Sequence, residues 1–302
     1  MQAGGIAGVC RHVASNDRAW ADGSWETADG LTLHYRDYAG RADRPPVLCL
    51  PGLTRNARDF EPVADAFAGR WRFIVVELRG RGESDYARDP ASYVPQQYVA
   101  DVAALIEREG LHDAVLFGTS LGGLMAMMLN AAMPGSFSGF LINDIGPEIA
   151  PAGLDRIRNT VGQGRSYPTW MHAARALQDM SGDAYPDYAI SDWLAQSKRL
   201  MCLSGNGRIA FDYDMKIAEP FAQVEEQTGA LDLWPLFRAL GDRPLLAIRG
   251  ELSDLLSAET FARMAREVPS MHAVTVPRVG HPPTLAEAEA QQAIGRLLDA
   301  IA

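Results

Sequence analysis

Short apolar runs alternate with helical patterns along most of the chain. Short, mostly apolar runs of four to seven residues predict strands that are covered on both faces. They occupy residues 46–50, 73–78, 114–117, 140–144, 244–250 and 273–277. Helical periodicity follows or separates these runs at residues 60–67, 97–108, 124–133 and 258–267, and again at the C-terminus. Strands that alternate with helices predict a mostly parallel, twisted sheet with helices on both faces, which is an α/β fold.

The pattern differs in three places, and these divide the chain. Asp29-Gly30 stands between two alternating runs, which is typical of an antiparallel hairpin. Residues 1–22 lack periodicity and predict an N-terminal arm. Between residues 147 and 234 strands and helices no longer alternate. Helical segments rich in aromatic residues and methionine predict an inserted helical cap there. The core then comprises residues 23–146 and 235–302.

Composition excludes several classes of partner. The hydrophobic fraction of 47% and the charged fraction of 22% are those of a folded globular protein. A formal net charge of −10 argues against binding to nucleic acid or to anionic membranes. Three cysteines are too few for a disulfide framework, and Cys49, inside an apolar run, predicts a buried free thiol.

The absence of targeting and cofactor motifs leads to expectations about the compartment and the cofactors of the protein. We see no signal-peptide pattern and no apolar run long enough to span a bilayer, so we expect a cytoplasmic protein without a membrane span. We also find no phosphate-binding loop, dinucleotide fingerprint or metal-ligand motif. The sequence therefore predicts no cofactor and no metal, and a small molecule as the substrate. It does not predict an oligomeric state.

Ser120 is the candidate nucleophile. It lies in FGTSLGG, residues 117–123, between a predicted strand and a predicted helix, as a nucleophile elbow requires. Glycines at 118 and 122 fit a turn too tight for a Cβ atom. The turn also places the hydroxyl at a helix N-terminus, which favours a developing negative charge.

A serine nucleophile needs a base, and the base needs an orienting carboxylate. His281 follows the last predicted strand, at the same sheet edge as Ser120, and is the best placed of the six histidines. Asp254, just past the preceding strand, is the favoured acid, although it could instead cap the next helix. Asp144, at the end of the strand before the cap, is the alternative acid.

The order of these residues and the motifs around them resemble the α/β-hydrolase superfamily over nearly the whole chain. The matching segments are LPGLTRN, ELRGRGESD, FGTSLGG, RGELSDLL and VGHPPTL. The resemblance implies that backbone N–H groups of Leu53 and Leu121 form an oxyanion hole. Two departures are Pro51 where many relatives have histidine, and Glu77 where relatives often have aspartate. We expect Glu77 to matter for loop structure.

The substrate is less well specified by the sequence. Arg55 could bind a substrate carboxylate or pair with a surface acid, and Trp170 in the cap could line an apolar pocket or pack the cap onto the core. We expect a serine hydrolase that cleaves carboxylic esters, lactones or thioesters of small, largely apolar substrates through an acyl-enzyme. One alternative is hydrolysis of a C–C bond in a diketone-like ring-cleavage product. Another is a non-catalytic ligand sensor on the same fold.

Overall fold

The computed structural model describes residues 18–220 and 232–302. Its main sheet has eight strands in the order β1-β2-β4-β3-β5-β6-β10-β11. The strands are β1 (Ala21–Glu26), β2 (Thr32–Tyr38), β3 (Val47–Leu50), β4 (Phe73–Val76), β5 (Ala114–Thr119), β6 (Phe137–Asn143), β10 (Leu245–Gly250) and β11 (His272–Val276). From β4 to β11 neighbouring strands are parallel, whereas β1 and β2 form the antiparallel hairpin expected at Gly30. The strand predictions are therefore confirmed.

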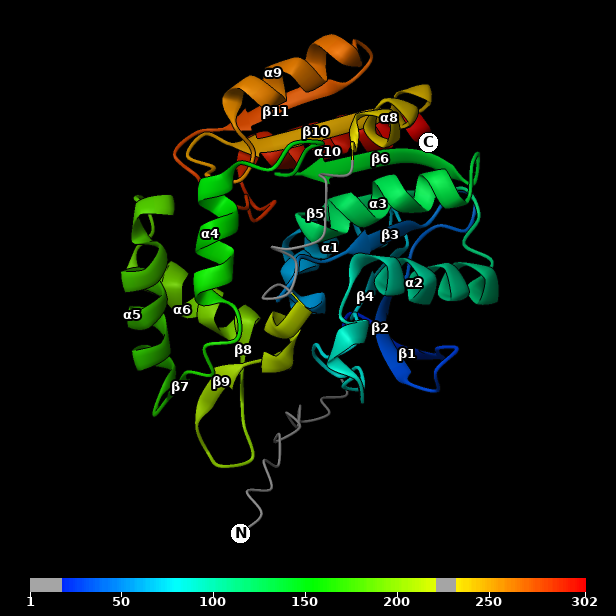
Figure 1. Cartoon of the computed structure of the whole chain (residues 1–302). Helices are drawn as coiled ribbons and strands as arrows, with labels where there is room; N and C mark the ends of the chain where they lie inside the picture. Colours follow the sequence, from blue (N-terminus) through cyan, green and yellow to red (C-terminus); the bar gives the residue numbers. More distant parts are fainter. Residues whose placement is uncertain (1–17, 221–231) are drawn as a thin grey trace.

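Helices cover both faces of this sheet (Figure 1). Those of the core are α1 (Glu61–Phe67), α2 (Pro95–Glu109), α3 (Leu121–Ala132), α8 (Trp234–Arg238), α9 (Ala258–Glu267) and α10 (Ala288–Ile301), with short 3-10 turns η1 (Ala57–Phe60), η2 (Pro90–Ser92) and η6 (Ala239–Asp242). Side chains of β3 alternate between the two apolar layers: Leu48 packs with α2 and α3, and Cys49 packs with α1 and α10. This alternation is why the strands read as continuous apolar runs.

We call residues 151–218 the cap segment, because they lie outside the main sheet, beside the carboxyl ends of its strands (Figure 1). Its elements are α4 (Pro151–Thr160), β7 (Ser166–Tyr167), α5 (Trp170–Ser181), η3 (Gly182–Ala184), α6 (Ile190–Leu200), β8 (Met201–Leu203), β9 (Ile209–Phe211) and η4 (Met215–Ala218). The expectation of a helical cap missed the three short strands, which form a small antiparallel sheet. The limits at 147 and 234 stay a prediction, and most of the expected arm lies outside the described residues.

A buried arginine joins the cap segment to the core. Arg58 of η1 donates from Nη2 to Asp212 Oδ2 at 2.6 Å and from Nε to the carbonyl of Arg199 at 3.0 Å. The same guanidinium reaches the carbonyl of Met201 at 3.3 Å. Because one core side chain binds three points of the cap segment, the two parts are held together by directional contacts as well as by apolar packing.

The structure also bears on the expected free thiol and on the expected absence of a membrane span. Cys49 is a buried free thiol, and its burial raises the pKa of that thiol well above the usual value. Cys202 is disulfide-bonded, which the composition gave no reason to expect. Among the described residues, no helix is both long and apolar enough to cross a membrane.

Candidate active site

Ser120 lies on the tight turn between β5 and α3. Its backbone has φ 53° and ψ −117°, a conformation that residues other than glycine rarely adopt. A Cβ atom on Gly118 would collide with the backbone of Gly122, and one on Gly122 would collide with the carbonyl of Leu50. The two glycines therefore let strand, turn and helix approach closely enough to hold the serine at the N-terminus of α3.

His281 lies between Ser120 and Asp144. Its Nε2 is 3.0 Å from Ser120 Oγ, and its Nδ1 is 2.8 Å from Asp144 Oδ2. The Asp144 side chain is 0% exposed and that of His281 is 7% exposed. Because an ionised carboxylate can only accept, Nδ1–H donates to Asp144 and Nε2 is left to accept the hydroxyl proton of Ser120.

The carboxylate of Asp144 is fixed by the neighbouring strand. Asp144 directly follows β6, and its Oδ1 accepts a hydrogen bond from the N–H of Gly250, at the end of β10, at 2.9 Å. Its own N–H donates to the carbonyl of Ile248 at 2.8 Å. With Oδ2 on His281, both oxygens are satisfied, as a buried carboxylate requires.

The expectation that Asp254 orients His281 does not match this geometry. Both oxygens of Asp254 accept from Arg156 of α4, at 2.6 Å from Nε and 2.8 Å from Nη2. Burial works to raise the pKa of Asp254, but the hydrogen bond and the charge of Arg156 outweigh it and lower the pKa. Asp254 is thus bound to the cap segment, and Asp144, the alternative acid, occupies the place beside His281.

Asp144 rather than Asp254 reaches His281 because the two aspartates lie at different distances along the chain from the ends of their strands. β6 and β10 are neighbours, so both aspartates leave the sheet at the same edge. Asp144 comes immediately after β6, whereas the chain continues from Gly250 before it reaches Asp254. There the carbonyl of Asp254 accepts the N–H of Gly153 at 3.0 Å, which ties this loop to α4.

The loop after β3 passes beside Ser120. A Cβ atom on Gly52 would lie 3.7 Å from Ser120 Cβ. The carbonyl of Gly52 accepts the N–H of Arg55 at 3.1 Å, and the carbonyl of Leu53 accepts from Arg81 Nε at 2.9 Å. Because a peptide group is planar, fixing the Gly52 carbonyl also fixes the direction of the Leu53 N–H.

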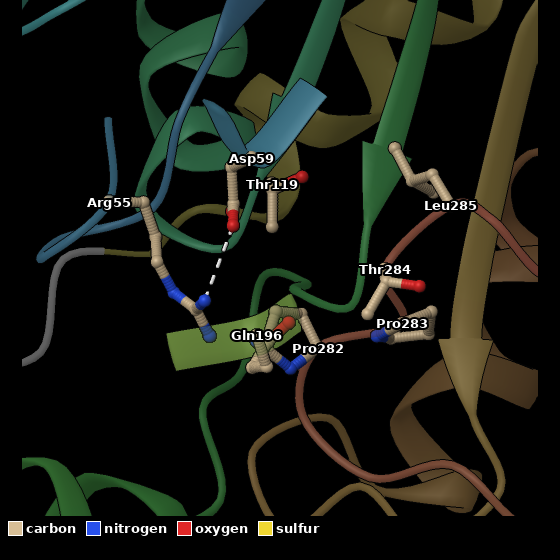
Figure 2. A pocket seen from close by; sticks show the side chains of 8 residues that line it. All are labelled: Arg55, Asp59, Thr119, Gln196, Pro282, Pro283, Thr284 and Leu285. Atoms are coloured by element: carbon tan, nitrogen blue, oxygen red, sulfur yellow. Dashed lines mark hydrogen bonds and ion pairs between the residues drawn. The ribbon is translucent and has the colours of Figure 1, made fainter. Parts of the chain in front are cut away.

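A cavity of about 100 Å³ opens onto Ser120 and His281. It is lined by Gly52, Leu53, Thr54, Arg55, Ser120, Arg156, Ile157, Thr160, Val161, His281 and Pro282. A second cavity, of about 10 Å³, shares Arg55 and Pro282 with the first and is shown in Figure 2. The second is large enough only for a water molecule, so the first is where a substrate group can enter.

Trp170, the other expected substrate contact, is not among the residues that line either cavity. It begins α5 and packs, half-buried, against the apolar cluster beneath the cap segment. Packing was the alternative that the sequence left open for this residue.

The sequence did not single out several residues that shape the site. Ile157 and Thr160 of α4 and Val161, which directly follows it, line the cavity together, and their helical spacing could have indicated a shared face. The Tyr185 hydroxyl donates to the carbonyl of Pro282, the residue after His281, at 2.8 Å. No pattern in the sequence links Tyr185 to Pro282, because that contact depends on how the cap segment docks.

Glu77 acts in loop structure, as expected. Its two carboxylate oxygens accept from the N–H of Ala57 at 3.0 Å and from that of Glu83 at 2.7 Å, and His34 Nδ1 lies 3.0 Å from Oε2. Within residues 18–220 and 232–302, no group of three or more His, Cys, Asp or Glu side chains is arranged to hold a metal ion.

Comparison with known proteins gives consistent matches. Residues 47–293 match the model of the alpha/beta hydrolase family. The chain is 33% identical over 261 residues to a 3-hydroxybutyrate-oligomer hydrolase of Cupriavidus necator, covering 84% of this chain and 88% of that protein. It is 28% identical over 253 residues to a 2-(acetamidomethylene)succinate hydrolase of Mesorhizobium japonicum, covering 83% and 85%.

A solved structure is also similar over nearly its full length. It is an alpha/beta hydrolase from Novosphingobium aromaticivorans, with 57% sequence identity and a TM-score of 0.91, and the match covers 94% of this chain and 99% of that one. The strand order, the turn that carries Ser120 and the match to the family model agree. The chain belongs to the alpha/beta hydrolase family and is a hydrolase.

Proposed function

We propose that the protein cleaves carboxylic esters through an acyl-enzyme formed on Ser120, with His281 as general base and acid and Asp144 as the carboxylate that orients it. The observation that carries this proposal is the continuous hydrogen-bonded chain from Asp144 Oδ2 through His281 to Ser120 Oγ, at 2.8 and 3.0 Å. A buried carboxylate stabilises the imidazolium that forms when the base takes up a proton.

The steps balance with these groups alone. Ser120 Oγ attacks the ester carbonyl while its proton passes to His281 Nε2, and the carbonyl electrons move onto the oxygen. The tetrahedral intermediate collapses, the C–O bond to the alcohol breaks, and His281 protonates the departing alkoxide. A water molecule then loses a proton to His281 and attacks the acyl carbon, which releases the acid and returns the proton to Ser120.

The backbone N–H groups of Leu53 and Leu121 are the proposed oxyanion donors. Leu121 is the first residue of α3, where a helix leaves its N–H groups without an intrahelical acceptor. Leu53 lines the cavity, and its peptide is held by the Gly52–Arg55 hydrogen bond. Loss of one such donor typically removes about 3 kcal/mol of transition-state stabilisation.

A small ester of a hydroxy acid is the substrate class that we favour. The relative from Cupriavidus necator acts, by its name, on 3-hydroxybutyrate oligomers, whose units are joined by ester bonds. A cavity of about 100 Å³ with apolar contributions from Leu53, Ile157 and Val161 suits a short acyl chain better than a long one. Lactones and thioesters would present the same carbonyl to Ser120.

The test is Ser120→Ala assayed with p-nitrophenyl butyrate beside a dimer of 3-hydroxybutyrate. We expect turnover of both esters to fall by a factor on the order of 10⁵ or more, with an unchanged melting temperature. Exposed Ser270→Ala is the matched control and should retain full activity. Retention of esterase activity by Ser120→Ala would overturn the proposal.

A ring-cleavage dienoate belongs in the same panel, because the same three side chains can serve hydrolysis of a C–C bond. Turnover of the dienoate without turnover of the esters would move the assignment to C–C hydrolysis. Binding of these compounds without turnover of any would instead favour a ligand sensor.

A further inference from the structure

Arg55 lies beside the nucleophile. A Cβ atom on Gly52 would lie 3.3 Å from Arg55 Cγ and 3.7 Å from Ser120 Cβ, so the stem of Arg55 and the nucleophile flank the same glycine. Arg55 lines the cavity that contains Ser120 and also the small cavity drawn in Figure 2. Its guanidinium is therefore within reach of a group that enters next to the reacting carbonyl.

The hydrogen bonding of Arg55 is incomplete. Nη1 donates to Asp59 Oδ1 at 3.2 Å, and this is a single, long contact rather than a bidentate pair (Figure 2). The side chain is only 16% exposed. Nε and Nη2 have no acceptor among the described residues, although a guanidinium carries five N–H donors. A largely buried guanidinium with free donors is stabilised by any anionic acceptor that enters.

Arg156, the other arginine that lines the cavity, is fully paired with a carboxylate of the protein. Its Nε and Nη2 are bound to the two oxygens of Asp254 at 2.6 and 2.8 Å, in the bidentate geometry that suits a carboxylate. Arg156 already has a carboxylate from the protein. Arg55 has the same arrangement of N–H donors, but only one carboxylate oxygen, that of Asp59, accepts from it.

The side chains that line the cavity and always carry a charge are both positive. Its lining contains two arginines and neither aspartate nor glutamate, in a chain with a formal net charge of −10. Because Arg156 is already paired with both oxygens of Asp254, Arg55, with its single contact to Asp59, is the arginine of the lining whose charge is better placed to attract an anionic ligand. Ester hydrolysis by itself needs no such charge, because the oxyanion is met by backbone N–H groups.

We propose that Arg55 binds a free carboxylate of the substrate, so that the enzyme acts on esters that carry a carboxylate close to the scissile bond. The acyl ester of a short hydroxy acid has this form. The inference rests on the proposed esterase function and narrows it to anionic esters. Arg55 is then a specificity-determining residue that holds one end of the substrate while Ser120 attacks the ester carbonyl.

The test compares two substrates that differ only in charge: 3-acetoxybutanoate and its neutral isostere 3-acetoxybutanamide. We expect the wild-type enzyme to show a kcat/KM at least about tenfold higher for the carboxylate, since a charge-assisted hydrogen bond is stronger than one to a neutral amide. Arg55→Gln should bring this ratio close to one, mainly by raising KM for the carboxylate. Arg55→Lys, which keeps the charge and loses the fork, should lie between them.

Controls separate the possible failures. Arg175→Gln removes an exposed cap arginine that lines neither cavity and should keep the wild-type ratio. A wild-type ratio of one, or a preference that survives in Arg55→Gln, would overturn the assignment of Arg55 while esterase function stands. If neither compound nor p-nitrophenyl butyrate is hydrolysed, the proposed function itself fails. If Arg55→Gln does not fold, the wild-type ratio and Arg55→Lys decide.

Discussion

Asp144 Oδ2 lies 2.8 Å from His281 Nδ1, and the same carboxylate accepts the N–H of Gly250 through its other oxygen. The carboxylate of Asp144 is therefore held by the sheet itself, at the junction of β6 and β10, whereas Asp254 lies on the longer loop after β10. The side chain of Asp254 is 34% exposed, and both of its carboxylate oxygens accept hydrogen bonds from Arg156. This difference between the two acids leads to the first prediction.

Asp144→Asn should lower kcat for a short ester by roughly a thousandfold or more, because an amide in this place no longer fixes the tautomer of His281 or stabilises the imidazolium. Asp254→Asn should lower it by less than about tenfold, since that side chain acts on Arg156. Steady-state kinetics of both variants, with melting temperatures, check this. Equal losses in the two variants, or a larger loss in Asp254→Asn, would contradict the assignment.

The turn at Ser120 leads to a prediction about stability. In Gly122→Ala the new Cβ would collide with the carbonyl of Leu50, so β3 and α3 would have to move apart. We expect a loss of about 2–4 kcal/mol in the free energy of unfolding, measured by urea denaturation. Gly182→Ala is the matched control, because its φ is −59° and nothing lies near its Cβ. It should be neutral or slightly stabilising.

Tyr185 contacts the loop that carries His281, and we expect it to position that loop. Tyr185→Phe leaves the carbonyl of Pro282 without its 2.8 Å hydrogen bond, and should cost about 1–2 kcal/mol of stability. We also expect a several-fold fall in kcat with little change in KM. The buried hydroxyl of Tyr167 has no hydrogen-bond partner within residues 18–220 and 232–302, so Tyr167→Phe should leave both the stability and kcat unchanged. An unchanged kcat in Tyr185→Phe would show that the loop keeps its position without this contact.

The buried carboxylate of Glu77 leads to a prediction about stability at acid pH. Burial works to raise the pKa of Glu77, but the hydrogen bond and charge of His34 and the N–H groups of Glu83 and Ala57 outweigh it and lower the pKa to about 2. A carboxyl group with a depressed pKa stabilises the fold above its unfolded pKa and loses that contribution as the pH falls towards 2. Glu77→Gln should therefore be less stable than wild type by about 3 kcal/mol at pH 6.

This difference should narrow steadily below pH 4.5, as unfolding curves at a series of pH values would show. The pKa of His34 is raised: its burial opposes the shift, and Glu77 and Asp22 cause it. The stability that protonated His34 contributes is complete below pH 6.5 and is lost as the pH rises through its folded pKa. A gap between Glu77→Gln and wild type that stays constant from pH 6 to pH 3 would contradict this assignment.

The sequence predicted most of the architecture because the signals were local. Apolar runs gave the strands, and Gly118 and Gly122 around Ser120 gave the turn. It placed His281 correctly beside Ser120, because the carboxyl ends of parallel strands share an edge. It favoured Asp254 over Asp144 as the acid, whereas the structure places Asp144 beside His281 and Asp254 on Arg156; both aspartates follow adjacent strands of that edge. The choice depends on the docking of α4 onto the core, which no local pattern encodes.

Covalent labelling of the wild-type protein with a fluorophosphonate probe, followed by peptide mass spectrometry, tests the central claim most directly. A serine activated by His281 and Asp144 should react stoichiometrically at Ser120, with concurrent loss of esterase activity. His281→Ala and Asp144→Asn should each slow the labelling by a factor on the order of a thousand. Absence of an adduct on Ser120, or hydrolysis that persists when Ser120 is fully labelled, would contradict a mechanism through Ser120.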